Sequence, residues 1–150
     1  MFDLANIAEV KLSYSTNVKP SERPQITDLK DVLPILKRIW PPETIELKEF
    51  FYTLLLDRAN KVLGAVRIGE GGISGTVADV RHIFQSAILS NSSSIILAHN
   101  HPSGNIEPSE ADIKLTRKIA EAGELHNIKV LDHIILTCES YYSFANEGMM

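Results

Sequence analysis

Two histidines one residue apart, His99 and His101, are the residues whose types and spacing most directly suggest chemistry. They lie at the end of a short apolar run, residues 92–100, which is typical of a buried strand. Residues i and i+2 of a strand point to the same side, so the two imidazoles are expected to project together. Two neutral imidazoles held side by side are a natural start for a zinc site.

A helix expected over residues 108–127 brings a third donor, because Asp112 lies in its first turn. Pro102 ends the strand and Gly104 allows the loop to bend back, so the helix start can approach the histidines. Three protein ligands leave a fourth position for water, which distinguishes catalytic zinc sites from closed structural ones. Zinc lowers the pKa of such a water to about 7. A nearby carboxylate would be needed to take its proton, and Ser109 could donate to an oxyanion.

The same residues also have a purely structural interpretation. Ser109 and Asp112 match the S-x-x-D capping box of a helix N-terminus, and two loop histidines need not bind metal. The capping box leaves the histidines unexplained, however, and a cap and a ligand can coexist in one turn. His99-Asn100-His101 also spells the name of a nuclease motif, but that motif is spread over a ββα unit and does not match this contiguous string.

The elements that must position these groups alternate between strands and helices. Strand patterns cover residues 7–15, 92–100 and 128–137, a hairpin is expected over residues 50–69, and helical spacing covers residues 27–40, 79–89 and 108–127. Thr27 or Asp28 can cap the first helix. The glycine-rich residues 69–76 lack a phosphate-loop pattern and favour a flexible flap or substrate platform. This order predicts a mixed α/β domain with a sheet of five or six strands and helices on its faces.

Asp132 and His133 lie inside the last of these strands. A buried, hydrogen-bonded residue is the favoured interpretation of His133. The alternative is that the pair supports the metal ligands from behind or contacts substrate. Cys138 follows the strand with no evident base beside it, so a cysteine nucleophile is disfavoured.

Length and composition restrict the class of protein. The 150 residues suffice for one domain, and the apolar fraction of 44% is ordinary for a globular chain. No apolar run approaches the roughly 20 residues of a membrane span, and the N-terminus has no basic region typical of a secretory signal. A single cysteine excludes an internal disulfide and favours the cytoplasm. The net charge of −4 argues against non-specific nucleic-acid binding.

The string AHNHPSGNIEPSEADIKLT, followed by LDHIIL, resembles the RadC-like JAB domain family of the JAB1/MPN/JAMM metalloprotease superfamily. The pattern His99-x-His101, seven residues, Ser109, two residues, Asp112 is similar to the JAMM motif, and the likeness runs from about Ile7 to the C-terminus. It implies a cytidine-deaminase-like three-layer α/β/α fold with a mixed central sheet, as a single domain over residues 1–150. We expect no N-terminal helix-hairpin-helix region, which many RadC-like proteins carry.

The resemblance also implies the parts of an active site. One zinc ion per chain would have three protein ligands: His99, His101 and Asp112. Ser109 would assist the transition state, and a glutamate before an earlier strand would activate the water. The matching segment assigns that role to Glu49, which the residues alone do not distinguish from Glu43 or Glu46.

The implied activity is hydrolysis of a peptide or isopeptide amide bond by a zinc-activated water. A hypothesis from another class is a binding module in DNA repair or recombination, without hydrolytic activity, which a salt-dependent DNA mobility shift would detect. We expect no membrane partner. The substrate is left open, and so is the oligomeric state, for which a homodimer is one expectation.

Overall fold

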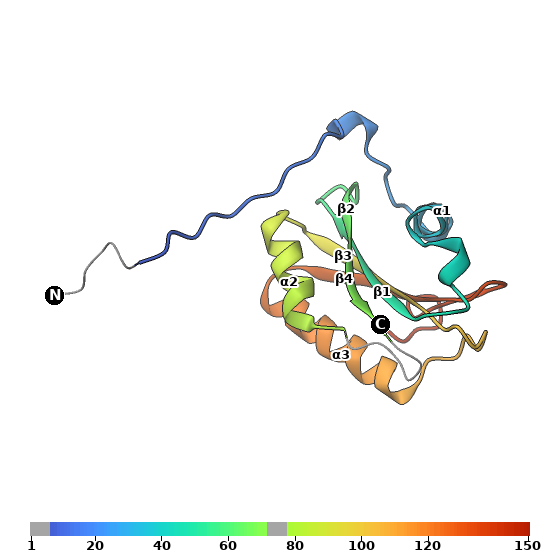
Figure 1. The fold of residues 1–150 in the computed structure, drawn as a ribbon. Helices are drawn as coiled ribbons and strands as arrows, with labels where there is room; N and C mark the ends of the chain where they lie inside the picture. Colours follow the sequence, from blue (N-terminus) through green and yellow to red (C-terminus); the bar gives the residue numbers. More distant parts are fainter. Residues whose placement is uncertain (1–6, 72–77) are drawn as a thin grey trace.

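A computed structural model describes residues 7–71 and 78–150 of the chain. Within these residues, five strands form one mixed sheet in the order β2-β1-β3-β4-β5 (Figure 1). The strands are β1 (Phe50–Leu56), β2 (Val62–Glu70), β3 (Ser94–Asn100), β4 (Lys129–Leu136) and β5 (Tyr141–Ser143). β3 and β4 run parallel, and the other neighbours pair antiparallel. The expected flap at residues 69–76 lies mostly outside the described residues.

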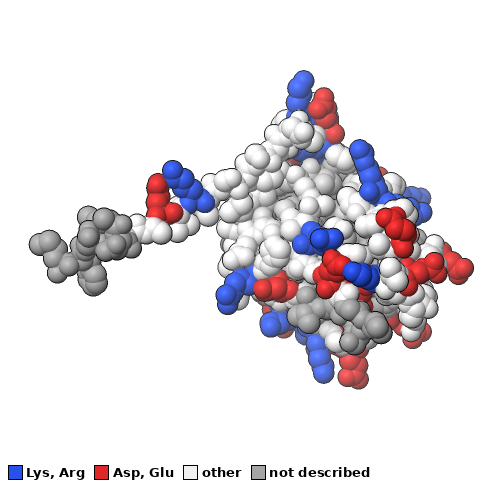
Figure 2. Space-filling view, viewed as in Figure 1, with Lys and Arg blue, Asp and Glu red and all other residues white. Residues whose placement is uncertain are grey.

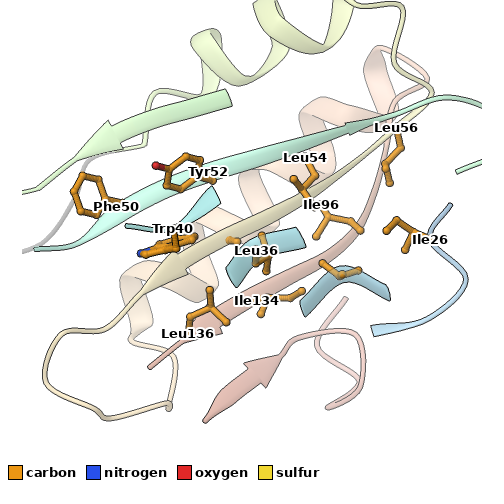
Figure 3. Packing of buried hydrophobic residues seen from close by; sticks show 12 residues of the cluster. Ile26, Leu36, Trp40, Phe50, Tyr52, Leu54, Leu56, Ile96, Ile134 and Leu136 are labelled. Carbon is orange, nitrogen blue, oxygen red and sulfur yellow. The ribbon is translucent and has the colours of Figure 1, made fainter. Parts of the chain in front are cut away.

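In the part of the chain that the structure describes, three α-helices cover the two faces of the sheet: α1 (Leu29–Ile39), α2 (Val80–Leu89) and α3 (Glu110–Leu125). Figure 1 shows α1 on one face and α2 with α3 on the other, which confirms the predicted three layers. The interior strand β1 is buried throughout and divides its side chains between the layers. Tyr52 and Leu54 join the cluster beneath α1 (Figure 3), whereas Phe51 and Leu55 join the cluster beneath α2 and α3.

The predicted boundaries of the hairpin and of the first helix agree closely with those in the structure. The hairpin over residues 50–69 appears as β1 and β2, and the helix at residues 27–40 appears as α1. Asp28 is its N-cap, because its carboxylate accepts from the Lys30 amide at 2.7 Å. Pro34 lies inside α1 without ending the helix. A short apolar stretch in the C-terminal tail forms β5 and adds an edge to the sheet.

The prediction of a strand at residues 7–15 is wrong. These residues pair with no strand among the described residues, and Figure 1 shows the segment running away from the domain. Their apolar side chains are exposed, as in Val10 at 84% and Leu12 at 77%. Alternation alone does not create a strand, because the apolar face also needs a surface on which to be buried.

No helix among the described residues is long and apolar enough to cross a membrane.

Candidate metal centre

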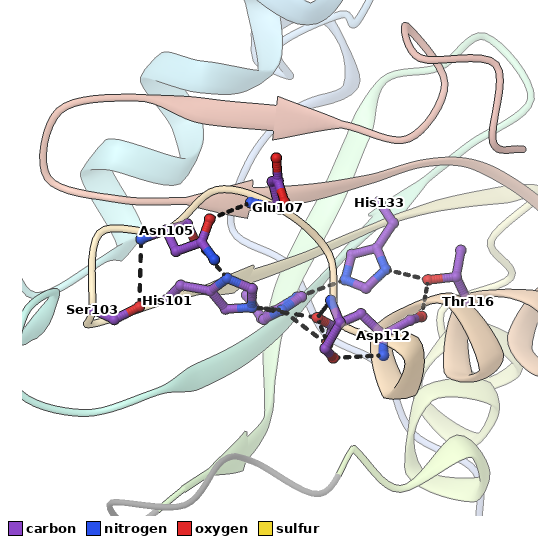
Figure 4. A network of polar contacts seen from close by, with 9 residues as sticks. His101, Ser103, Asn105, Glu107, Asp112, Thr116 and His133 are labelled. Atoms are coloured by element: carbon purple, nitrogen blue, oxygen red, sulfur yellow. Dashed lines mark hydrogen bonds and ion pairs between the residues drawn. The ribbon is translucent and has the colours of Figure 1, made fainter.

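The candidate site lies between the end of β3 and the start of α3 (Figure 4). Three side chains converge there, with one potential ligand atom each, all within 4.8 Å of one another: His99, His101 and Asp112. The Nε2 atoms of His99 and His101 are 3.0 Å apart. Asp112 reaches both rings, with Oδ1 3.3 Å from His99 Nε2 and Oδ2 3.4 Å from His101 Nε2. The structure thus brings together the three residues that the sequence identifies as ligands.

The backbone around these residues explains their convergence. The His101 amide donates to the Leu136 carbonyl at 2.9 Å, which continues the pairing of β3 with β4 one residue past Asn100, the end of β3. Gly104 has a φ of +82°, a left-handed conformation that glycine adopts without strain, and it turns the loop. His101 Nδ1 donates to the Asn105 carbonyl at 2.7 Å, which orients the ring with Nε2 toward the cluster. The loop therefore fixes the second histidine while returning the chain to α3.

Asp112 is also the N3 residue of a capping box whose N-cap is Ser109, so the predicted cap is confirmed and shares its aspartate with the three-residue cluster. Ser109 Oγ accepts from the Asp112 amide at 3.1 Å. In return, Asp112 Oδ2 accepts from the Ser109 amide and from its hydroxyl, each at 2.7 Å. These bonds hold the carboxylate in one orientation at the helix start. The cap is therefore part of what positions the third donor.

The donor set fits a zinc ion in chemical type and in spacing. Imidazole nitrogen and carboxylate oxygen bind zinc at about 2.0–2.2 Å, so two ligands of a tetrahedral ion lie about 3.3 Å apart. The separations of 3.0, 3.3 and 3.4 Å between the donors match this value. His99 is buried, whereas the side chains of His101 and Asp112 keep 16% and 15% exposure. The cluster is therefore partly exposed to solvent, which a site that also takes a water ligand requires.

Electrostatic interactions in the cluster favour a cation. The Asp112 carboxylate raises the pKa of His101 against the opposing effect of burial, and the Asn105 carbonyl and the charge of Glu49 add to the increase. Burial works to raise the pKa of Asp112, but contacts with His101 and His99 outweigh it and hold that pKa well below its usual range. A proton and a metal ion therefore compete for the same place, and metal binding releases protons.

Further polar contacts connect two of the candidate ligands, His99 and Asp112, to buried residues of β4 and α3. His133 Nε2 is 2.8 Å from His99 Nδ1, and His133 Nδ1 is 2.6 Å from the hydroxyl oxygen of Thr116. Thr116 also donates to the Asp112 carbonyl at 2.6 Å. Burial lowers the pKa of His133 well below its ordinary value. His133 is thus the buried, hydrogen-bonded residue that its sequence context favours, and it also touches a candidate ligand.

Asp132, the neighbour of His133, bonds elsewhere. Its Oδ1 accepts from the His133 amide at 2.7 Å and the Ala145 amide at 2.9 Å, and its Oδ2 accepts from Ser143 Oγ at 2.6 Å. Burial raises the pKa of Asp132, and these three bonds offset part of that increase. None of these contacts is with a member of the three-residue cluster. The Asp132 carboxylate fastens the C-terminal segment to β4.

Glu49 approaches the cluster through the pairing of β1 with β3. Phe51 pairs with His99 in this antiparallel ladder, so the register continued by two residues sets Glu49 opposite His101. Both positions lie on the face of the sheet toward α2 and α3, because side chains alternate along a strand. The effect of the Glu49 charge on the pKa of His101 agrees with this placement. The Gly71 amide donates to the Glu49 carbonyl at 2.8 Å and fixes its backbone.

Asn100, between the two histidines, points to the opposite face and holds the segment that carries Glu49. Its side chain is fully buried, and Nδ2 donates to the carbonyls of Ile45 and Lys48, each at 2.7 Å. Its Oδ1 accepts from the Phe50 amide at 2.7 Å. The Lys48 and Phe50 bonds bracket Glu49 on both sides. The Asn100 side chain therefore fixes the backbone on both sides of Glu49 relative to β3, the strand that carries His99.

Replacing Asn100 with Ala is expected to lower the free energy of unfolding by about 2 kcal/mol or more, because buried backbone groups lose their partners. Amide hydrogen exchange of residues 45–50 should accelerate more than exchange in the rest of the sheet. Ile96→Ala, on the same strand and face, costs about 2–5 kcal/mol and serves as the control. The same acceleration over residues 45–50 in both variants would contradict a local role for Asn100.

Asn100 and Thr116 are not among the residues predicted from the sequence. For Thr116 a signal exists, because it follows Asp112 by one helical turn and so lies on the same face of α3. Asn100 has none, because strand alternation turns it away from the histidines and its partners come from a segment distant in sequence.

Comparison with known proteins identifies the family of the chain. Residues 26–149 match the family described as the RadC-like JAB domain. A UPF0758 protein of Flavobacterium johnsoniae is 43% identical over 126 residues, which cover 83% of this chain and 53% of that protein. A UPF0758 protein of Geotalea uraniireducens is 48% identical over 103 residues, covering 69% and 45%. The chain spans about half the length of these curated relatives. It belongs to the RadC-like JAB domain family.

Proposed function

We propose that this chain is a JAMM-type zinc-dependent hydrolase that cleaves a peptide or isopeptide amide bond. The observation that carries the proposal is the spacing of His99, His101 and Asp112 at the distances of tetrahedral zinc ligands, with one side exposed. Membership of the RadC-like JAB domain family supports the same ligand set. We place the protein in the cytoplasm, because its single cysteine fits a reducing compartment.

Each residue of the site has a task in this proposal. His99, His101 and Asp112 would hold the ion, which supplies Lewis-acid activation of a water and of the scissile carbonyl. Glu49 takes the proton of the attacking water and passes it to the leaving amine. Ser109 donates a hydrogen bond to the oxyanion that forms on the substrate carbonyl.

Ser109 can serve both the helix and a substrate. Its side chain is exposed at the start of α3, and its hydroxyl donates to Asp112 Oδ2. The hydroxyl must turn its proton toward the substrate when the oxyanion forms. The Ser109 amide keeps its own bond to Asp112 Oδ2 at 2.7 Å, so the carboxylate stays held while the hydroxyl turns.

The charge of the chain weighs against the competing function of a DNA-binding module. The net charge is −4, and Figure 2 shows acidic and basic side chains interspersed over the face in view. Duplex binding draws its affinity from Lys and Arg that neutralise phosphates. A salt-dependent mobility shift with duplex DNA would favour the binding module.

The direct test of the proposal is amide hydrolysis by the purified full chain supplied with zinc. Peptide and isopeptide libraries, followed by mass spectrometry, should give products that disappear when a chelator removes the metal and return when zinc is restored. Cleavage that survives chelation would overturn the proposal. So would a protein that holds one zinc per chain and cleaves no member of either library.

A further inference from the structure

We propose that Thr116 and His133 are positioning residues that hold His99 in the tautomer whose Nε2 lone pair is free to bind a metal ion. The inference rests on the proposed metal site, because it explains how one of its ligands is prepared. It assigns a task to two buried residues that take no part in the hydrolytic steps described above.

The direction of the hydrogen bonds begins at a backbone carbonyl. The Thr116 hydroxyl donates to the Asp112 carbonyl at 2.6 Å, and a carbonyl oxygen can only accept. The hydroxyl has one proton, so that proton is committed to Asp112. The contact of 2.6 Å between Thr116 Oγ1 and His133 Nδ1 must then be a bond in which the imidazole donates.

The next step follows from the surroundings of His133. The ring is fully buried between two aromatic side chains, with centroids 4.9 Å from Phe144 and 5.5 Å from Phe51. A charged ring is costly in such a setting, so the imidazole carries one proton, on Nδ1. Its Nε2 is left as an acceptor and receives the Nδ1 proton of His99 at 2.8 Å. His99 therefore has a bare Nε2, which is the atom that faces His101 and Asp112.

Donation in the opposite direction, from Thr116 through His133 to His99, is unfavourable at Thr116 and at His99. If Thr116 donated to His133, the hydroxyl oxygen and the Asp112 carbonyl would be two acceptors 2.6 Å apart with no proton between them. The reversed chain would also end with a proton on His99 Nε2, where the metal ion must bind. Only one direction satisfies the contacts of Thr116, of His133 and of His99 Nδ1, and it is the direction that leaves His99 Nε2 for a metal ion.

His101 offers an internal comparison, because its ring is oriented separately. Its Nδ1 donates to the Asn105 carbonyl at 2.7 Å, so the proton on that Nδ1 is held by the loop and not by Thr116 or His133. Removing the Thr116 hydroxyl should therefore disturb the tautomer of His99 and leave the Nδ1 bond of His101 in place.

The test compares the wild type with Thr116→Val, Thr116→Ser and Thr53→Val. Valine keeps the branched shape of Thr116 without its hydroxyl, and serine keeps the hydroxyl. Thr53 supplies a matched control, because its hydroxyl is buried and has no hydrogen-bond partner among the described residues. Imidazole ¹⁵N NMR of the metal-free full chain reads the tautomers, zinc competition with a chelator reads affinity, and a thermal melt checks folding.

We expect His99 of the wild type to carry its proton on Nδ1, and Thr116→Val to lose this preference and bind zinc about 10–100-fold more weakly. Thr116→Ser should restore both properties, and Thr53→Val should match the wild type. A proton on His99 Nε2 in the wild type would overturn the inference, as would unchanged zinc affinity in a folded Thr116→Val. Neither readout needs turnover, so failure of hydrolysis alone would count against the proposed function and not against this role.

Discussion

Glu49→Gln is expected to retain one zinc ion per chain and to hydrolyse amide bonds about 10²- to 10⁴-fold more slowly than the wild type. Glutamine has nearly the shape of glutamate but cannot accept a proton from the attacking water. Glu49 is outside the set of three donors, and its backbone is held by Gly71 and by the bonds of Asn100, which the substitution does not touch. The variant should therefore keep the zinc content of the wild type while its turnover falls.

The matched control is Glu43→Gln, an exposed glutamate shortly before Glu49 that the sequence alone does not exclude as the base. This control should keep both zinc and turnover. Turnover that is undiminished in Glu49→Gln, or metal that is lost from it, would remove Glu49 from the mechanism.

The second large effect is expected for Asp112→Asn, which should fold with α3 intact and bind zinc far more weakly. An asparagine oxygen can still accept from the Ser109 amide, so the helix start keeps a cap. The amide carries no negative charge to balance the ion, and the charge that raises the pKa of His101 is gone. The loss of affinity should exceed the roughly 10–100-fold typical of residues that only support a ligand.

Ser109→Ala is the control that separates the cap from the ligand. It removes the hydroxyl that bonds the Asp112 amide and should cost about 1 kcal/mol of stability. Zinc binding should persist, because the Ser109 amide still holds Asp112 Oδ2. Urea unfolding and chelator competition measure the two quantities. If Asp112→Asn bound zinc as tightly as Ser109→Ala, the carboxylate would have no place among the ligands.

Much of the fold and the cluster could be predicted because the signals are local. Strand alternation places His99 and His101 on one side, and the capping pattern places Asp112 in the first helical turn. These three positions need only a strand, a short loop and a helix, all adjacent in the chain. The local pattern therefore carries enough geometry to predict that the three side chains meet.

The remaining features depend on contacts between distant segments. Glu49 lies near enough for its charge to affect the pKa of His101 because β1 pairs with β3 in a register that no short pattern encodes. The exposed segment at residues 7–15 fails for the same reason, because its alternation finds no surface on which to be buried. Register and burial belong to the assembled sheet, so Glu49 could be assigned beforehand only from a family resemblance.

The most direct measurement is the metal content of the purified full chain, determined by mass spectrometry for the wild type and for His101→Ala. We expect about one zinc ion per wild-type chain and loss of that ion from the variant, because His101 supplies one of three donors at tetrahedral spacing. A wild type that holds no metal even after zinc is supplied would contradict this expectation. The motif would then be a capped helix start beside two histidines, and the hydrolase proposal would fall.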